Sequence, residues 1–182
     1  ILGTVIGARL GHCLFYDPVY YLSNPLEMIK VWEGGLASHG AAIGIPFSIY
    51  LLTKKQKDKT VLWILDRVVI VVALAAVLIR LGNLFNSEIL GTATDVPWAF
   101  IFARVDDVPR HPAQLYEAIF YLISFIILYF VYYKTEKKSK QGFIFGFFLL
   151  LIFGFRFFVE FLKIEQSAFE KGMILDMGQL LS

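Results

Sequence analysis

The sequence predicts an all-α, polytopic integral membrane protein, and three observations lead to this fold class. Of the 182 residues, 58% are hydrophobic and only 18% are charged, against roughly a quarter in ordinary globular domains. The apolar residues gather in stretches close to the roughly 20 residues that cross a bilayer core. Charged loops, two of them rich in lysine, separate these stretches. The net charge of +2 argues against a nucleic-acid binder, and the single cysteine cannot form an internal disulfide.

About six membrane segments follow one another in a single membrane domain, residues 1–182. The chain begins inside an apolar stretch without Met, and we expect it to be part of a longer protein, incomplete at both ends. The expected segments are the end of a span at about 1–16, full spans at about 34–52, 61–85, 112–133 and 142–162, and a sixth beginning near Gly172. Asp17-Pro18 and Asn24-Pro25 break the chain after the first segment.

The charges of the loops alternate and predict the orientation in the membrane. Loops 54–59 and 134–140 each carry four lysines and one acidic residue. Loops 17–33 and 86–111 carry more acidic than basic residues. By the positive-inside rule, the two lysine loops face the cytoplasm, and 17–33 and 86–111 are periplasmic loops.

Polar side chains inside the predicted spans are candidates for function, because a charge at the bilayer centre costs about 2.5–3.5 kcal/mol. These residues are Arg9, His39, Asp66, Arg67, Arg80, Asn83, Asn86, Glu117, Arg156 and Glu160. Asp66 and Arg67 lie near a cytoplasmic span end and fit an interfacial anchor pair. Most of the others lie toward the outer ends of four spans, which predicts one polar layer there.

Arg80, Asn83 and Asn86 are spaced i, i+3, i+6 and share a broad helix face. One interpretation is a clamp for a phosphate headgroup, since arginine presents a planar fork of donors. The alternative is a polar network between helices. Gly82 would let another backbone approach closely.

Arg156 and Glu160 stand one helical turn apart. They could neutralise each other, or Glu160 could orient Arg156 toward an anion. His39 opens a span among several glycines, which would leave its surroundings open to a substrate, and it is a candidate for proton transfer; a packing role is the alternative. His111 before Pro112 fits a helix start, with Gln114 and Glu117 suited to the positive end of the helix dipole.

Two features are weaker. Cys13 fits a small buried apolar residue. Arg9-Leu10-Gly11-His12 is similar to Arg80-Leu81-Gly82-Asn83, by chance or because two arginines surround one site.

Several motifs together resemble those of the prolipoprotein diacylglyceryl transferase family. They cover nearly the whole chain in the family's order. The motifs are Gly7–Gly11 with Phe15-Tyr16, Ser38-His39-Gly40 after a double glycine, Arg80–Glu88 ending at Gly91, His111–Glu117, Phe155-Arg156-Phe157 with Glu160-Phe161, and Gly178–Ser182.

The resemblance implies an enzyme of the bacterial cytoplasmic (inner) membrane, with its site toward the outer leaflet. Such an enzyme transfers the diacylglyceryl group of phosphatidylglycerol to the lipobox cysteine of a prolipoprotein signal peptide and releases glycerol 1-phosphate. No cofactor, metal or nucleic acid is implied. The resemblance makes Arg80, Arg156 and His39 catalytic candidates. It makes Asn83, Asn86, Glu88, Glu160, His111, Gln114, Tyr116 and Arg9 candidates for substrate binding.

The chain departs from the family pattern at two places. Ser87 stands where the family usually has glycine, and 165–167 differs from the family's more usual charged turn. Two other functions stay open from the sequence. A transporter or channel for an anionic solute predicts polar residues through the full membrane depth, and a non-catalytic assembly subunit predicts that the arginines serve stability.

Overall fold

The computed structural model describes residues 2–55, 58–134 and 140–164. The chain forms two compact units, Ile1–Ile64 and Leu65–Ser182, and each is described by itself. The elements of the first unit are α1 (Leu2–Phe15), α2 (Pro18–Ser23), the 3-10 helices η1 (Pro25–Ile29) and η2 (Val31–Glu33), and α3 (Ser38–Lys55). Then come α4 (Val61–Asn86), β1 (Phe100–Ile101), β2 (Pro109–Arg110), α5 (Ala113–Lys134) and α6 (Phe143–Glu160).

The all-α prediction is confirmed, with one short β-hairpin inside a loop. Each of the five apolar segments within the described residues forms a helix, and α4, α5 and α6 are long and apolar enough to cross a membrane. Helix α1 is apolar but shorter. The segment predicted to begin near Gly172 lies outside the described residues.

Helices α1 and α3 pack through glycines that recur at every fourth position. A Cβ atom at Gly40 would collide with the backbone carbonyl of Gly7, and one at Gly44 would collide with that of Gly3. The expectation that glycines leave open space around His39 is therefore wrong at Gly40 and Gly44, because the backbone of α1 fills that space. Small residues let two helix backbones approach closely.

The start of α3 also differs from the prediction. The helix begins at Ser38, whereas Gly34 and Gly35 adopt positive φ angles of 90° and 65° in the preceding segment. Glycine reaches this region without a steric penalty. His39 therefore stands in the first turn of the helix, and not five residues after the start of a span that begins at residue 34.

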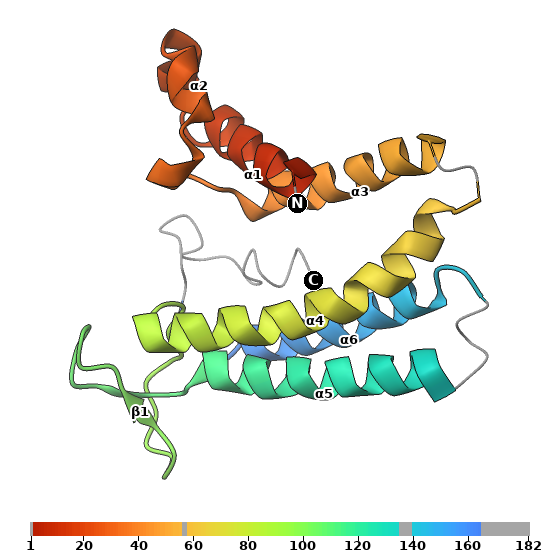
Figure 1. Ribbon diagram of the computed structural model, residues 1–182. Helices are drawn as coiled ribbons and strands as arrows, with labels where there is room; N and C mark the ends of the chain where they lie inside the picture. Colours follow the sequence, from red (N-terminus) through yellow and green to blue (C-terminus); the bar gives the residue numbers. More distant parts are fainter. Residues whose placement is uncertain (1, 56–57, 135–139, 165–182) are drawn as a thin grey trace. The chain divides into compact units, whose positions relative to one another are not determined.

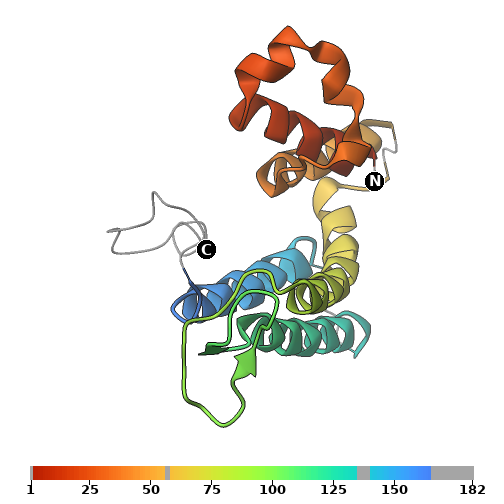
Figure 2. The same cartoon turned by 90° about the vertical axis from the view of Figure 1, so that its left-hand side faces the viewer.

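Helices α4, α5 and α6 lie side by side in the second unit (Figures 1 and 2). Their apolar contacts form a core of Val69, Ile70, Ala73, Leu128, Ile144 and Phe148. Asp66 is buried and its carboxylate accepts hydrogen bonds from the backbone N–H groups of Gly142 (2.7 Å) and Phe145 (2.8 Å). Asp66 thus accepts hydrogen bonds from backbone N–H groups at the amino end of α6, which have no partner within the helix. This buried role corrects the prediction that Asp66 is an anchor at the membrane interface. Arg67 lies over the ring of Tyr132.

The loop between α4 and α5 begins with a Schellman turn. The N–H of Ser87 donates to the carbonyl of Leu84 (3.2 Å), and that of Glu88 donates to Asn83 (2.9 Å). Ser87 has a φ of 57°, the left-handed conformation that glycine favours at this position. Ser87, where the sequence departs from the resembled family pattern, thus has a backbone conformation that glycine adopts without a steric penalty.

The rest of the loop forms the β1–β2 hairpin and pairs with the end of α6. Phe100 pairs with Arg110 in the hairpin, where Arg110 contacts Asp106 at 2.6 Å. The hydrogen bond from Arg110, together with one from the Val108 N–H, lowers the pKa of Asp106. In Figure 1 this loop lies where α4 ends and α5 begins.

Candidate active site

Five charged residues of the second unit meet where α4 and α6 end and α5 begins, and we call them the charged cluster: Arg80, Glu117, Arg156, Glu160 and Lys163. The side chain of Glu117 is fully buried. Its Oε2 lies 3.0 Å from Arg80 Nε as an ion-pair contact without a directed hydrogen bond. Its Oε1 accepts a hydrogen bond from Lys163 Nζ at 3.1 Å, and Lys163 also donates to Glu160 Oε2 at 3.0 Å. Glu117 thus links two cations, which the helix-dipole interpretation of the sequence did not predict.

Arg156 is the least constrained member of the charged cluster. Its Nε lies 4.0 Å from Glu160 Oε2, is buried, and has no hydrogen-bond partner in the part of the chain that the structure describes. The closer ion pair of Glu160 is with Lys163 and not with Arg156. The side chain of Arg156 is 34% exposed, so its guanidinium keeps donors for another group.

Hydrogen bonds through the side-chain amide of Asn83 connect Arg80 to Glu88. Arg80 Nη1 donates to Asn83 Oδ1 (3.3 Å), and Asn83 Nδ2 donates to Glu88 Oε2 (2.7 Å). Asn86 Nδ2 lies 3.5 Å from the other oxygen of Glu88. The predicted shared face of these residues on α4 is confirmed. The prediction that Gly82 permits a close backbone approach finds no support among the described residues, because a Cβ there would meet no described atom within 4 Å.

Gln114 lies next to these hydrogen bonds, and its side-chain oxygen is an acceptor that no described residue uses. Its Nε2 donates to the backbone carbonyl of Glu88, whereas its buried Oε1 accepts no hydrogen bond from any described residue. A buried polar atom without a partner costs about 1–3 kcal/mol. Gln114 Oε1 is therefore suited to accept a hydrogen bond from a hydroxyl group.

A second polar group forms where loop 86–111 meets α5. Trp98 Nε1 donates to the Tyr116 hydroxyl at 2.8 Å, and His111 Nδ1 lies 3.2 Å from the same oxygen. Tyr116 also lines a groove of about 430 Å³ between α5 and α6. Apart from Tyr116, the groove is lined by Ile119, Phe120, Ile123, Phe155, Phe158, Val159 and Leu162. One wall of this groove is thus polar at its Tyr116 end and apolar elsewhere.

Arg9 lies in the first unit, where it binds backbone carbonyls. Its guanidinium donates to Glu27 (2.6 Å), Met28 (3.1 Å), Gly34 (2.6 Å) and Gly35 (3.2 Å). These bonds hold the segment before α3 against α1. The two similar arginine motifs also differ in packing, because a Cβ atom at Gly11 would lie 2.7 Å from Gly40, whereas one at Gly82 would meet no described atom within 4 Å.

His39 is exposed at the start of α3, beside the end of α1. Its ring meets Phe15 edge-on at 5.2 Å and stacks on Tyr16 at 5.8 Å. Among the described residues, neither ring nitrogen has a hydrogen-bond partner, so both are available to a substrate. Cys13, predicted to be a buried apolar residue, is buried.

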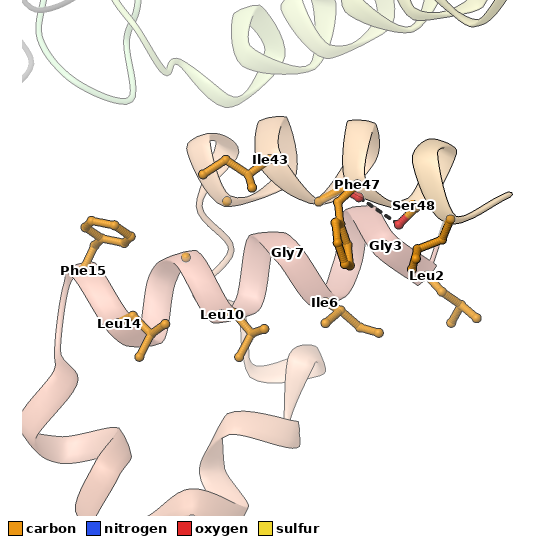
Figure 3. A pocket seen from close by; sticks show the side chains of 14 residues that line it. Leu2, Gly3, Ile6, Gly7, Leu10, Leu14, Phe15, Ile43, Phe47 and Ser48 are labelled. Atoms are coloured by element: carbon orange, nitrogen blue, oxygen red, sulfur yellow. Dashed lines mark hydrogen bonds between the residues drawn. The ribbon is translucent and has the colours of Figure 1, made fainter. Parts of the chain in front are cut away.

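An apolar groove of about 540 Å³ runs along α1 and α3 in the same unit. Figure 3 shows Ile6, Leu10 and Leu14 of α1 along it and Ile43 and Phe47 of α3. The dashed line there joins the Ser48 hydroxyl to the carbonyl of Gly44 at 2.8 Å. The groove is lined by apolar side chains, glycines and Ser48, and it is suited to hydrocarbon rather than to a charged group.

Two residues of the site were not predicted. Lys163 is 3% exposed and bridges both buried glutamates, and Tyr121 donates to Glu117 Oε1 at 3.1 Å. Lys163 follows Arg156 and Glu160 at i+7 and i+3, so the helical spacing of Arg156, Glu160 and Lys163 carries a signal for it. The predicted motif Gly178–Ser182 and the departure at 165–167 lie outside the described residues.

Comparison with known proteins gives a consistent result over the entire chain. Residues 1–182 match the family described as prolipoprotein diacylglyceryl transferase. A phosphatidylglycerol–prolipoprotein diacylglyceryl transferase from Chloroherpeton thalassium is 52% identical over all of this chain and 68% of the relative. A protein of the same name from Tolumonas auensis is 48% identical over 100% of this chain and 70% of the relative. One from Bacteroides fragilis is 52% identical over 99% of this chain and 69% of the relative.

Proposed function

Because the chain belongs to the prolipoprotein diacylglyceryl transferase family, we propose that it transfers the diacylglyceryl group of phosphatidylglycerol to a cysteine thiol of a prolipoprotein. The match over the full chain is the observation that carries the assignment. It is supported by the charged cluster, which contains Arg80 and Arg156 with donors that no described residue uses fully.

The reaction forms one bond and breaks one bond. The sulfur of the lipobox cysteine attacks the glyceryl carbon that carries the phosphate, and a thioether C–S bond forms. The C–O bond between that carbon and the phosphate breaks, and glycerol 1-phosphate leaves with the bonding electrons. The thiol proton passes to a base and finally to the phosphate or to solvent, so no redox cofactor is required.

The two arginines act on the leaving phosphate. A guanidinium fork matches two phosphate oxygens, and its charge opposes the negative charge that grows as the C–O bond breaks. Asn83 accepts a hydrogen bond from Arg80 and donates one to Glu88, which holds Arg80 in place. Glu160 lies 4.0 Å from Arg156. Gln114 Oε1 accepts from a headgroup hydroxyl, and the groove at Tyr116 receives an acyl chain.

His39 takes the proton from the thiol. Only the thiolate attacks well, and a free thiol titrates near pH 8.5. An imidazole can act as a general base and accept that proton, and no described residue forms a hydrogen bond with the ring nitrogens of His39. Arg9 helps to position His39, because its hydrogen bonds fix the double-glycine segment just before α3.

The protein is a bacterial membrane protein, and its place and orientation form part of the proposal. We place it in the inner membrane with the site toward the outer leaflet, where the lipobox of a translocated prolipoprotein emerges. The acidic loops 17–33 and 86–111 are then periplasmic, as the positive-inside rule favours.

The direct test is the mass of the product. Purified full-length protein is incubated with phosphatidylglycerol and a lipobox peptide, and the peptide mass should rise by one diacylglyceryl group. Matched controls replace the peptide cysteine by serine, or the lipid by zwitterionic phosphatidylethanolamine. An unchanged peptide mass with phosphatidylglycerol, in folded wild-type preparations, would contradict the proposal.

A further inference from the structure

Lys163 is the one buried lysine of the described residues, and it contacts both buried carboxylates of the charged cluster. The cluster contains three cations, Arg80, Arg156 and Lys163, and two anions, Glu117 and Glu160. Its formal charge is therefore +1. Glu88 adds little to this sum, since it is exposed to solvent and reaches Arg80 only through Asn83.

Without Lys163 the same cluster would be neutral. Glu117 already lies 3.0 Å from Arg80, and Glu160 lies 4.0 Å from Arg156. Each carboxylate would then depend on the nearest guanidinium for its counter-charge. Because a buried charge needs a partner, both arginines would be drawn away from an incoming anion.

The fold holds Lys163 in place through its backbone. Gly91 forms an antiparallel bridge with Lys163, and the flanking N–H groups of Thr92 and Ile164 donate to Leu162 (2.8 Å) and Leu90 (3.0 Å). A Cβ atom at Gly91 would collide with the carbonyl of His111. The loop after α4 therefore fixes the position of the lysine beyond the end of α6.

We propose that Lys163 is a positioning residue that neutralises the two buried glutamates and so leaves Arg80 and Arg156 free to bind a lipid phosphate. This inference rests on the proposed function of the two arginines. Lys163 itself touches no substrate, and it acts by setting the charge and the free donors of the arginines.

The test compares three variants of the full-length protein in detergent with phosphatidylglycerol and a lipobox peptide. Lys163→Arg keeps the charge, and its kcat/KM should stay within about threefold of wild type. Lys163→Met makes the cluster neutral and should lower kcat/KM about 10²-fold, mainly through a higher KM for phosphatidylglycerol. Lys163→Met combined with Glu160→Gln restores the charge of +1, and its kcat/KM should be at least about tenfold higher than that of Lys163→Met alone.

The double variant separates charge balance from packing. A packing role would make the second substitution neutral or harmful, so a double variant no better than Lys163→Met would overturn the inference. Wild-type kinetics in Lys163→Met would overturn it as well. If Lys163→Met alone does not fold, the double variant must fold, and its transfer rate must lie within about tenfold of wild type. A folded but inactive double variant would overturn the inference.

A binding measurement distinguishes failure of the inference from failure of the proposed function. Glycerol 1-phosphate should raise the melting temperature of wild type and of Lys163→Arg, but not that of Lys163→Met. If wild type shows this stabilisation but no transfer, the proposed function fails and the role of Lys163 stands. If wild type transfers and Lys163→Met binds the phosphate equally well, the inference fails and the function stands.

Discussion

Ser87 ends α4 with a left-handed backbone that a serine adopts only at a cost. Its φ of 57° stands where the Schellman turn favours glycine. We expect Ser87→Gly to stabilise the protein by about 1 kcal/mol, because the left-handed region costs about that much for other residues. Thermal unfolding in detergent should show a melting temperature higher by about 2–4 °C. Ser87→Ala removes the hydroxyl but keeps the strain, and an equal gain in that control would refute this explanation.

His39 has two ring nitrogens that form no hydrogen bond with any described residue, and we predict that it acts as the base. His39→Gln should fold and bind phosphatidylglycerol, but transfer slowly. The defect should shrink as the pH rises, because solvent then supplies more thiolate without help from a base. Transfer rates of both proteins from pH 6 to 9 test this. A ratio of rates that stays constant over that range would leave His39 a packing or binding role.

The residues on regular helices could be predicted and those fixed by loop pairing could not. Helical spacing is enough to put Arg80 and Asn83 on one face of α4, and the structure confirms it. Lys163 lies beyond the end of α6, where its position depends on pairing with Gly91 in a remote loop. The spacing of Arg156, Glu160 and Lys163 is a signal for their shared helical face, but no local pattern reports the pairing of Lys163 with Gly91, which lies far away in the sequence.

The contact of α1 with α3 depends on glycine at the element scale. We expect Gly40→Ala to destabilise the protein by about 1–3 kcal/mol, since its Cβ would collide with the Gly7 carbonyl. Gly82→Ala is the matched control, because a Cβ there meets no atom of the described residues within 4 Å and alanine favours the helix. Unfolding in detergent compares the two. A Gly40→Ala protein as stable as Gly82→Ala would show that α1 and α3 do not pack in this way.

The element boundaries illustrate what periodicity can and cannot predict. Apolar length alone located α4, α5 and α6 closely, because each spans a bilayer's thickness. The start of α3 was misplaced, since Gly34 and Gly35 are apolar in composition but adopt positive φ angles. Those angles depend on Arg9, whose guanidinium binds both carbonyls from another helix.

At the scale of the whole molecule, the lysine-rich loops predict the orientation. We expect loops 54–59 and 134–140 to face the cytoplasm. Single cysteines placed in these loops, in a Cys13→Ser background, should resist a membrane-impermeant thiol reagent in intact cells. Cysteines in loop 86–111 serve as the accessible control. Ready labelling of the lysine loops would reverse the orientation and move the site to the other leaflet.

The central claim is that Arg80 and Arg156 hold the phosphate of the lipid through planar guanidinium forks. The most direct measurement is kcat/KM for diacylglyceryl transfer in Arg80→Lys and Arg156→Lys, with Arg67→Lys in α4 as the matched control. Each of the first two variants should lose about 10²-fold or more, roughly 2.7 kcal/mol of transition-state stabilisation, because an ammonium cannot copy a bidentate fork. Arg67→Lys should keep near-full activity, since a lysine can still lie over Tyr132. Near-full activity in Arg80→Lys or Arg156→Lys would contradict the claim and leave that arginine a general charge or a packing role.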